Sequence, residues 1–436
     1  MPSEARRVAL DVLRRTFEQG SYTDRAFQTA ARDLQPRDRA LAMRLAYGAV
    51  QRRATLDHLI EQCAERPVSK LEPLVRAALR LGSYELCFTQ DAQHAAVNDT
   101  VELARASRGK GVVNAVLRRL AREHTELLAA LDDRTPAAAA TMHSVPTWIA
   151  NEWFETLGAD SARALLARVN EPAEHALRAN TLLTDAATLA AALDVRSTVP
   201  GDPPEAVVVH EQFDAHGSRL WAAGHFMPQS RASMLVAHAL DPQPGDRVLD
   251  MCAAPGAKTT HIAALMRDQG QITAIERNKG RADELQRTVT RMGAHHVTVR
   301  LHDAGEFRAD GPKFSRTLVD APCSGLGTIQ SRPDLRWRVT PEAVQALAAQ
   351  QARLLSAAAR ATAPGGVLVY STCTISVAEN ERQIGAFLDE HREFQVIDLE
   401  PRFPAWSHPR GGGWLLALPH LQGSDGFFIA ALRREG

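Results

Sequence analysis

Apolar residues in the first 130 positions recur with a period of about 3.6 residues, the spacing of one face of an α-helix. In KLEPLVRAALRLG (70–82) they fall at i, i+3, i+4, i+7 and i+8, and Gly82 is expected to end or bend that helix. The same period recurs in ARRVALDVLRRTF and VVNAVLRRLARE, whereas alternating β-branched runs are absent. The pattern predicts an all-α N-terminal domain.

The pattern becomes mixed after this region. Residues 130–142 contain a proline and an alanine run, which is typical of a connector. Two helical stretches (148–158 and 161–170) then precede short strand-like pieces such as EAVVVH (205–210). We predict a small α+β segment here.

From about Gln229 onward, strand-like runs alternate with helical stretches. The runs RVLDM, QITAIE, VTVRLH, RTLVD and GGVLVYS alternate with helical patterns, the first of which begin at Lys258 and Lys279, and FFIAALR closes the series. Such alternation predicts an α/β domain whose mostly parallel sheet is covered on both faces. The predicted division is an all-α domain in 1–142, an α+β segment in 143–228 and an α/β domain in 229–436.

Composition adds limits to this division. The chain has 436 residues, 45% of them apolar and 23% charged, which fits two or three globular domains. Its apolar runs stay short of the roughly 18 residues that a membrane helix needs, and MPSEARRVAL lacks the apolar core of a signal peptide. We therefore expect a cytoplasmic protein without a membrane partner. The cysteines number five and include no C-x-x-C pair, so we expect neither a disulfide framework nor a metal site.

The charge pattern permits a nucleic-acid partner without requiring one. The formal net charge is zero, but residues 141–230 carry 5 Lys/Arg against 11 Asp/Glu. Both flanking regions are consequently mildly basic, as an RNA-binding surface would be.

The ends of the predicted strands carry the candidate chemistry, because ligands of such sheets bind outside the carboxyl ends of the strands. The first strand runs into DMCAAPGAKTTH (250–261), whose small residues let a ligand approach the backbone. The next strands end at Glu276, Asp303 and Asp320. A nucleoside-bearing cofactor fits this series, with its ribose on Glu276, its adenine near Asp303 and a cationic end near Asp320. The alternative is that these acids only cap the helices that follow.

Two of the cysteines are candidates for catalysis. Cys63 and Cys87 lie in helical patterns and Cys252 lies in the loop after the first strand, so all three are expected to serve packing. Cys323 and Cys373 instead follow strand ends that face the predicted site, where a thiol can act as a nucleophile.

The need for a thiol indicates the kind of reaction. Methyltransferases that act on amino groups often carry Asp/Asn-Pro-Pro-aromatic at the fourth strand end, whereas this chain has Asp320-Ala-Pro-Cys323. An exocyclic amine needs no covalent help, but C5 of a pyrimidine becomes nucleophilic only after a thiolate adds to C6. The thiols therefore favour carbon methylation. Spacing alone does not decide whether Cys323 or Cys373 is the nucleophile, and DNA cytosine methyltransferases place theirs in Pro-Cys.

A family resemblance covers nearly the whole chain. DMCAAPGAKTTH, TLVDAPCSGLGTIQSRPDLRW, VYSTCTISVAENE and GSDGFFIAALRR resemble the motifs of the Nop/Sun family of RNA cytosine-5 methyltransferases. RAALRLGSYELCF, AAVNDTVELAR and GVVNAVLRRL resemble a NusB-like RNA-binding domain, and NEPAEHALRAN (170–180) weakly marks the middle segment. This domain order is that of the Sun/Fmu (RsmB) type of 16S ribosomal RNA methyltransferase. It implies a Rossmann-like domain that uses S-adenosyl-L-methionine to methylate a cytosine in 16S ribosomal RNA, free or in a small-subunit assembly intermediate.

The resemblance also implies residue roles. Cys373 matches the nucleophile, Cys323 the cysteine linked to product release, and Asp320 the motif acid, which also borders the cofactor. Glu276 matches the acid for the ribose and Asp303 the acid near adenine. The implied cofactor loop consists of Cys252, Ala253, Ala254, Pro255, Gly256, Ala257 and Lys258.

The sequence departs from the family pattern at three places. Ala257 replaces a glycine, which would cost cofactor affinity if the position needs a positive φ. Glu276 replaces an aspartate, and Gln229-Ser230 stands where Gln-Asp is usual.

Candidate RNA contacts come from two regions, and two other functions stay open. The RNA candidates are Arg332, Arg336 and Arg338, and in the helical domain Arg105, Arg108, Lys110, Arg118 and Arg119. We expect a monomer. The alternatives are a transfer RNA substrate, or an RNA-binding module with an inactive transferase domain.

Overall fold

The computed structural model describes residues 2–90, 93–309 and 311–436. The chain folds into two compact units, each with its own set of internal contacts. The helical unit comprises residues 1–171 and 329–338, and the sheet unit comprises residues 172–328 and 339–436. Residues 143–171 thus group with the helical unit, whereas the three predicted domain boundaries stay a prediction.

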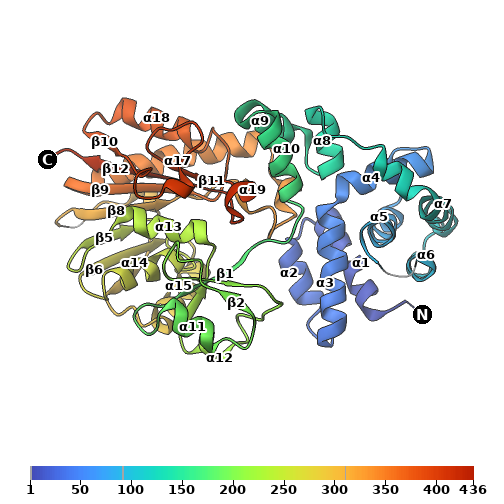
Figure 1. Cartoon of the computed structure of the whole chain (residues 1–436), viewed down its shortest axis with the longest axis horizontal. Coiled ribbons are helices and arrows are strands. Elements are labelled where there is room, and N and C mark those ends of the chain that lie inside the picture. The colour runs from blue at the N-terminus through green and yellow to red at the C-terminus, as the bar shows by residue number, and fades with distance from the viewer. Residues whose placement is uncertain (1, 91–92, 310) are drawn as a thin grey trace. The chain divides into compact units, whose positions relative to one another are not determined.

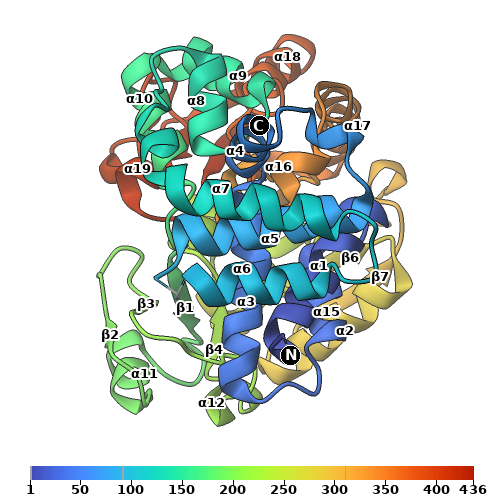
Figure 2. The same cartoon turned by 90° about the vertical axis from the view of Figure 1, so that its right-hand side faces the viewer.

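The helical unit contains only helices within its described residues, as predicted for the N-terminal region. Figure 2 shows α5, α6 and α7 side by side, and their apolar faces share one buried core with α1, α3 and α4. Its helices are α1 (Glu4–Glu18), α2 (Thr23–Ala30), α3 (Pro36–Gln51), α4 (Arg53–Ala64), the 3₁₀ turn η1 (Val68–Lys70), α5 (Pro73–Phe88), α6 (Gln93–Leu103), α7 (Lys110–Ala129), α8 (Pro136–His143), α9 (Thr147–Leu157), α10 (Ala159–Arg168) and α16 (Leu335–Arg338).

Two local predictions for this unit were wrong. Gly82 does not end a helix but lies inside α5, where an added Cβ would be 2.7 Å from Cδ1 of Leu117 in α7. The glycine allows close helix packing. The expected connector at 130–142 contains most of α8, because Thr135 caps the amide of Ala138 and the alanines that follow favour helix.

The segment 329–338 lies within the α/β part of the sequence but folds with the helical unit. Arg336 in this segment is fully buried and donates hydrogen bonds to the carbonyl oxygens of Ser144 (3.0 Å) and Val169 (3.1 Å). Trp337 donates its indole N–H to the carbonyl oxygen of Val50 at 2.7 Å. Arg336 is therefore unavailable to an RNA backbone, and its assignment as an RNA contact was wrong.

The sheet unit contains the predicted α/β architecture. The main sheet has the order β10-β12-β9-β8-β5-β6-β7, with β11 paired to β12. The five strands β9, β8, β5, β6 and β7 are parallel, and β12 runs antiparallel to β9 and β10. The strands are β5 (Arg247–Asp250), β6 (Gln271–Glu276), β7 (Val297–Leu301), β8 (Phe314–Asp320), β9 (Thr362–Thr372), β10 (Phe394–Ile397), β11 (Leu415–Ala417) and β12 (Phe427–Arg434).

Helices cover both faces of this sheet (Figure 1). One layer contains α13 (Arg231–Leu240), α14 (Ala257–Leu265) and α15 (Lys279–Arg291), and the other contains α17 (Pro341–Ala361) and α18 (Glu381–Glu390). The chain leaves β5 for β6 on one side and later returns to β8 on the other side. This reversal is a topological switch point, where ligands of open α/β sheets bind. A short helix, α19 (Pro419–Gln422), precedes β12.

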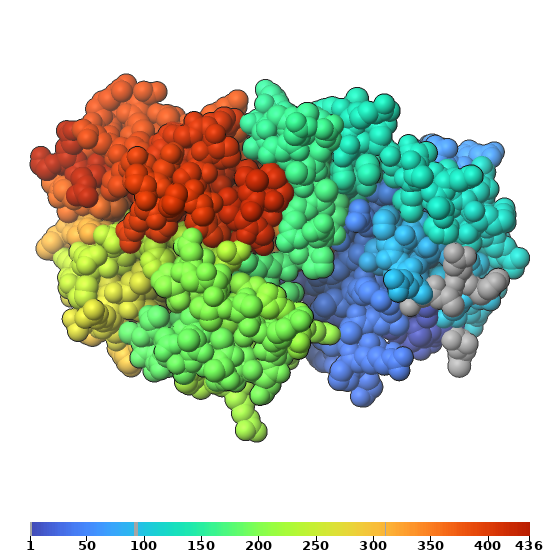
Figure 3. Space-filling view, viewed as in Figure 1, coloured from blue at the N-terminus to red at the C-terminus, as the bar shows by residue number. Residues whose placement is uncertain are grey.

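Residues 172–228 form a second, antiparallel sheet of order β2-β3-β1-β4. Its side chains enclose a small apolar core that includes Leu177, Val207 and Phe226. In the space-filling view these green residues adjoin yellow-green residues that follow them in the chain (Figure 3). Its elements are β1 (His175–Ala179), α11 (Ala186–Ala192), β2 (Ser197–Thr198), β3 (Ala206–Val209), α12 (Arg219–Ala222) and β4 (Phe226–Pro228).

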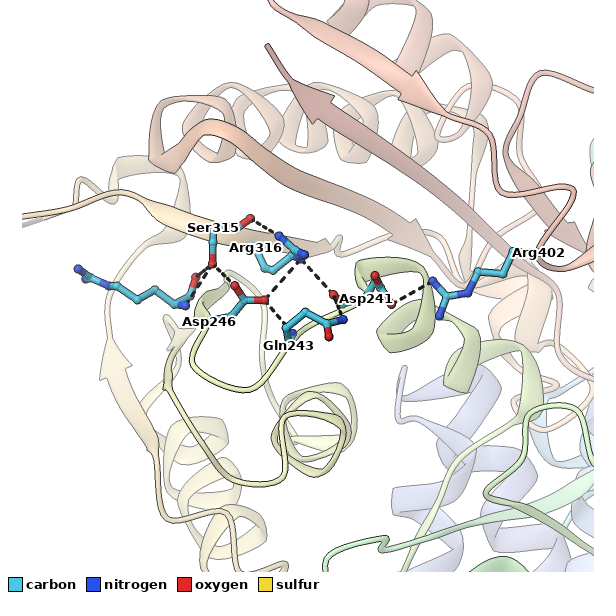
Figure 4. Close-up of polar contacts among 7 residues, drawn as sticks. Asp241, Gln243, Asp246, Ser315, Arg316 and Arg402 are labelled. Atoms are coloured by element: carbon cyan, nitrogen blue, oxygen red, sulfur yellow. Dashed lines mark hydrogen bonds and ion pairs between the residues drawn. The ribbon is translucent and has the colours of Figure 1, made fainter. Parts of the chain in front are cut away.

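A polar network joins the amino ends of β5 and β8 (Figure 4). Ser315 donates to Oδ1 of Asp246 at 2.8 Å, and Arg316 contacts both Asp246 and the carbonyl oxygen of Asp241. Arg402 pairs with the Asp241 carboxylate at 3.2 Å. These acids serve structure at the sheet edge opposite the predicted site. Across the described ranges, every helix is too short or too polar to cross a lipid bilayer.

Candidate active site

Parallel pairing of β8 with β9 brings the two candidate cysteines together. Asp320 pairs with Ser371 in this ladder, and each strand then ends in a loop that carries a cysteine. The Sγ atoms of Cys323 and Cys373 lie 3.3 Å apart, and both residues are reduced thiols with partial exposure. The structure thus places both predicted thiols at the carboxyl edge of the sheet.

The Cys323 thiol holds its proton more tightly than an ordinary cysteine does. The hydrogen bond to Cys373, together with burial, raises the pKa of the Cys323 thiol well above its usual value. The nearby Glu379 carboxylate acts in the same direction. Cys323 therefore keeps its proton and can donate it toward the sulfur of Cys373. An anion on Cys373 would be stabilised by that donation.

The other cysteines serve packing, as predicted. Cys63 is a core residue of α4, and burial raises the pKa of Cys87 to about 12. Burial also raises the pKa of Cys252, and the neighbouring Asp250 and Asp320 add to the effect. None of these three thiols is prepared to ionise.

Asp320 lies beside the thiol pair and is held from two sides. Lys258 places its Nζ 2.7 Å from Oδ2 of Asp320, and Ser371 donates to Oδ1 at 2.9 Å. The Lys258 ammonium also lies 5.0 Å from the centre of the Phe427 ring. The ion pair fixes the direction of the Asp320 carboxylate, whereas the roles that the resemblance implied for Asp320 and Lys258 stay predictions.

Glu379 holds the two cysteine loops together, a role that sequence reasoning missed. This buried carboxylate accepts from the backbone amide and the hydroxyl of Ser324, the residue after Cys323. It also accepts from Gln351 at 3.0 Å, while Ser324 shares a hydrogen bond of 2.8 Å with Thr374, the residue after Cys373. The sequence signal is VAENE (377–381), which belongs to the motif VYSTCTISVAENE but to which the resemblance gives no residue roles.

Asn380, the next residue, braces the same loop. Its amide donates to the carbonyl oxygen of Thr374 at 3.0 Å and its oxygen accepts from Thr372 at 2.6 Å, on either side of Cys373. Two glycines complete the support, because the amide of Gly426 donates to Gly327 and the amide of Gly327 donates to the carbonyl oxygen of Cys373. A Cβ on Gly327 would lie 2.0 Å from the oxygen of Gly426, so only glycine fits there.

The predicted cofactor loop, residues 252–258, leads from β5 into α14. Gly256 has φ of 107°, a conformation that favours glycine, whereas Ala257 is already the first residue of α14 and has no positive φ. The affinity cost considered for Ala257 therefore does not arise. Ser230, the other departure, precedes α13 without a side-chain capping bond.

Two of the predicted acids lie at the carboxyl ends of β6 and β7. Glu276 is buried and accepts from the amide of Asn278 at 2.8 Å, with Arg281 3.6 Å away. Asp303 is exposed and caps the 3₁₀ turn η2 (Ala304–Glu306) through the amide of Gly305. The capping alternative thus describes part of what Asp303 does.

Asp250, at the end of β5, was missed although the strand-end rule applies to it as well. Thr259 donates to its Oδ2 at 2.7 Å, but its buried Oδ1 has no partner among the described residues. Burial raises the pKa of Asp250 to about 6. An unpaired buried acceptor, a buried strand-end glutamate and a glycine that admits close approach fit the hydroxyl and ammonium donors of S-adenosylmethionine.

The fold and the site together define a Rossmann-like methyltransferase domain with a pair of thiols at its strand ends. A family model described as 16S rRNA methyltransferase RsmB/F matches residues 237–433, and the NusB family model matches residues 3–122. The chain is 38% identical to a probable ribosomal RNA small subunit methyltransferase B of Synechocystis, over 99% of both proteins. It is 37% identical to ribosomal RNA small subunit methyltransferase B of Thermus thermophilus, over 91% of this chain and 89% of the relative.

A crystal structure of the protein PH0851 matches with a TM-score of 0.83 and 26% identity, over 100% of this chain and 99% of that chain. The chain belongs to the 16S rRNA methyltransferase RsmB/F family. The predicted family resemblance is therefore confirmed, as is the multi-domain architecture with a NusB-like part.

Proposed function

We propose that this protein transfers a methyl group from S-adenosylmethionine to C5 of a cytosine in 16S ribosomal RNA through a covalent adduct with Cys373. The observation that carries the proposal is the 3.3 Å contact between Cys323 and Cys373 beside the Asp320 carboxylate. Methylation of an exocyclic amine or a hydroxyl needs no such thiol pair, whereas C5 of a pyrimidine needs a nucleophile on C6.

The first half of the reaction makes a bond from Cys373. The target base leaves its stack, as base-modifying chemistry requires. The Cys373 thiolate adds to C6, and the electron pair of the C5=C6 bond becomes available at C5. Asp320 hydrogen-bonds the N3/N4 edge and favours the protonated ring, which accepts the thiolate more readily. C5 then forms its new bond to the methyl carbon.

The second half breaks the Cys373 bond. Removal of the C5 proton restores the C5=C6 bond and expels the Cys373 sulfur. Cys323 passes its own proton to that sulfur and takes the C5 proton, so the two thiols end protonated and one proton is later lost to solvent. The raised pKa of Cys323 supports this assignment only in that it keeps this thiol protonated, so that it has a proton to give to the departing sulfur.

S-adenosylmethionine supplies an electrophilic methyl group on a sulfonium and leaves as a neutral thioether. The residues that would hold it are the loop 252–258, Glu276 for the ribose hydroxyls and Asp303 near the adenine edge. Asp250 and Asp320 provide negative charge for its cationic end. This set is supported by their common place at the carboxyl edge of β5, β6, β7 and β8.

The RNA class is inferred from the relatives. Two of them are named ribosomal RNA small subunit methyltransferase B, and the NusB-like part supports binding of RNA. A monomer that acts on free RNA or on an assembly intermediate stays a prediction. Exposed Arg105, Arg108 and Lys110 are the candidates for phosphate contacts in the helical unit.

Bisulfite sequencing of ribosomal and transfer RNA from cells with and without the gene tests the proposal. We expect one or more cytosines of 16S ribosomal RNA to lose protection in the deletion strain, and a Cys373→Ala copy to fail to restore it. Loss of protection only in transfer RNA would establish the alternative substrate. Unchanged RNA, with cofactor still bound by the protein, would favour a binding module with an inactive transferase domain.

A further inference from the structure

Arg178 is a fully buried cation that belongs to the small antiparallel sheet and reaches the cofactor helix α14. Its guanidinium donates to Oγ1 of Thr260 at 2.9 Å and to the carbonyl oxygen of Ala257. A third bond of 2.6 Å goes to Oε1 of Gln229, just before α13. Ala257 and Thr260 form the first turn of α14, directly after the cofactor loop.

Joining β1 to α14 through a buried guanidinium carries an energetic cost. Burial of an ion costs several kcal/mol, and a cation near a helix N-terminus opposes the helix dipole. An apolar contact between β1 and α14 would avoid both costs. What the guanidinium adds is a planar fork that fixes the direction of several acceptors at once. The contact therefore sets the position of the α14 first turn as well as holding it.

A second charged side chain of the small sheet, that of Glu205, also contacts α14. Glu205, whose carbonyl oxygen accepts from the amide of Ala179 next to Arg178, is buried immediately before β3. Its carboxylate lies 2.7 Å from Nε2 of His261 in α14 and 2.9 Å from Nε2 of His238 in α13. Arg178 and Glu205 thus contact positions 257, 260 and 261 of α14, and their opposite charges offset each other inside the protein.

A metal ion is the other occupant that this cluster suggests. Glu205, His238 and His261 have ligand atoms within 4.8 Å of one another. Two features oppose a cation there. Burial lowers the pKa of His261 to about 4, and the Arg178 charge acts in the same direction, which places a fixed positive charge beside the cluster. In addition, Nδ1 of His261 has no hydrogen-bond partner among the described residues. Zinc-bound histidines normally donate that second N–H to an acceptor.

We propose that Arg178, supported by Glu205, is a positioning residue for the cofactor site and that the small sheet is part of that site's scaffold. Arg178 fixes the turn that contains Ala257, and Lys258 follows in the same turn with its Nζ on Asp320. The small sheet therefore acts on cofactor affinity and on the orientation of Asp320. This inference rests on the proposed cofactor role of residues 252–258.

The test uses the full chain and the variants Arg178→Met and Arg178→Lys. Affinity for S-adenosylhomocysteine is measured by calorimetry, RNA affinity by filter binding, and order in the α14 first turn by hydrogen exchange. Arg291→Met is the matched control, because Arg291 of α15 also donates to carbonyl oxygens of the small-sheet region, at Trp221 and Phe226. Among the described residues its hydrogen bonds go to this region and not to the loop 252–258 or α14.

We expect Arg178→Met to weaken S-adenosylhomocysteine binding by about tenfold or more, because small misplacements of a binding turn carry costs of that order. RNA affinity should stay within about twofold, and Arg178→Lys should restore part of the loss. Exchange in residues 257–261 should rise in both Arg178 variants and not in Arg291→Met. If Arg178→Met misfolds, Arg178→Lys decides.

Equal cofactor affinity in the native protein and both Arg178 variants would overturn the proposal, as would an equal loss in Arg291→Met. One equivalent of zinc in the purified protein, required for cofactor binding, would overturn the role given to Glu205. Failure of the native protein to bind S-adenosylhomocysteine would instead refute the proposed function, and the exchange data would still judge the link from Arg178 to α14.

Discussion

The sulfur atoms of Cys323 and Cys373 lie 3.3 Å apart, although 50 residues separate them in the chain. Two neighbouring parallel strands bring them together, and Glu379 and Asn380 hold the loops that follow. Because the two sulfurs lie within hydrogen-bond distance, we expect one thiol to serve as the acid while the other attacks. We therefore expect the reactivity of the thiol pair to depend on Glu379 and Asn380, which hold its two loops, as well as on the two cysteines.

The first prediction concerns Glu379. Its replacement in Glu379→Ala removes the acceptor for the Ser324 amide and for Gln351, so both cysteine loops should lose their alignment. We expect kcat to fall by about 100-fold with little change in cofactor affinity, since misplacement of reacting groups carries costs of that order. Steady-state kinetics and calorimetry measure the two quantities.

Glu381→Ala is the control for this prediction. Glu381 belongs to the same motif but pairs with His408 and Arg410, away from the thiols. It should retain native kcat. Equal losses of kcat in Glu379→Ala and Glu381→Ala would mean that the motif supports the domain in general and not the thiol pair.

The second prediction separates two arginines of the segment 329–338. Arg336→Met should lower the stability of the helical unit by about 3 kcal/mol, because buried carbonyl oxygens of Ser144 and Val169 lose their donor. Arg332→Met, at an exposed position, should change stability by less than about 0.5 kcal/mol and weaken RNA binding instead. Chemical unfolding and RNA titrations of both variants check this, and the opposite pattern would restore Arg336 as an RNA contact.

Much of the sheet unit could be predicted from the sequence because buried parallel strands are short apolar runs between turn residues. QITAIE matches β6 at both ends, and the strands that end at Asp320 and near Cys373 were placed well enough to bring both cysteines to one edge. Thr135-Pro136 is a helix-start signal and the alanines after it favour helix, so α8 could also have been predicted from the sequence.

The remaining features depend on contacts between distant positions. Gly82 appears in sequence as a helix breaker, and only the position of Leu117 explains it. Arg178 and Arg336 occur in polar stretches that resemble surface segments, yet both are fully buried. Their acceptors are carbonyl oxygens and amide or hydroxyl side chains of other elements. The hydrophobic periodicity of a single segment contains no information about such distant acceptors.

The third prediction concerns pH. Burial, together with the Arg178 charge, lowers the pKa of His261 to about 4, so the folded protein excludes a proton that the unfolded chain binds below about pH 6.5. The contribution of neutral His261 to the free energy of unfolding is fully present above pH 6.5 and is lost as the pH falls toward 4. Between pH 7 and pH 5 the loss amounts to about 2 kcal/mol.

The measurement compares the native protein with His261→Gln. The protein can unfold in more than one transition, and the relevant one is the transition whose urea midpoint rises when S-adenosylhomocysteine is added. Its free energy of unfolding is measured by urea denaturation at pH 7 and at pH 5. The variant should lose less stability on acidification than the native protein. Asp250, whose raised pKa acts in the opposite direction, is present in both and cancels. Identical losses would show that His261 does not titrate differently in the two states.

The fourth prediction concerns the helical unit. Arg108→Glu and Lys110→Glu should each weaken RNA binding and reduce the slope of log Kd against log salt by about one, because each removes a phosphate contact. Cofactor affinity should not change. Arg134→Glu changes the net charge equally but lies outside the NusB match, at 80% side-chain exposure. If all three variants bind RNA as the native protein does, this part contacts another protein and not RNA.

The most direct measurement of the central account is a trapping experiment with the two cysteine variants. Each variant is incubated with labelled RNA and S-adenosylmethionine, and the products are separated on a denaturing gel. Cys323→Ala should accumulate a covalent protein–RNA species, because Cys373 still forms its bond to the base while the variant lacks the thiol that assists release. Cys373→Ala should form neither the adduct nor methylated RNA. An adduct in Cys373→Ala and none in Cys323→Ala would contradict the account and make Cys323 the nucleophile.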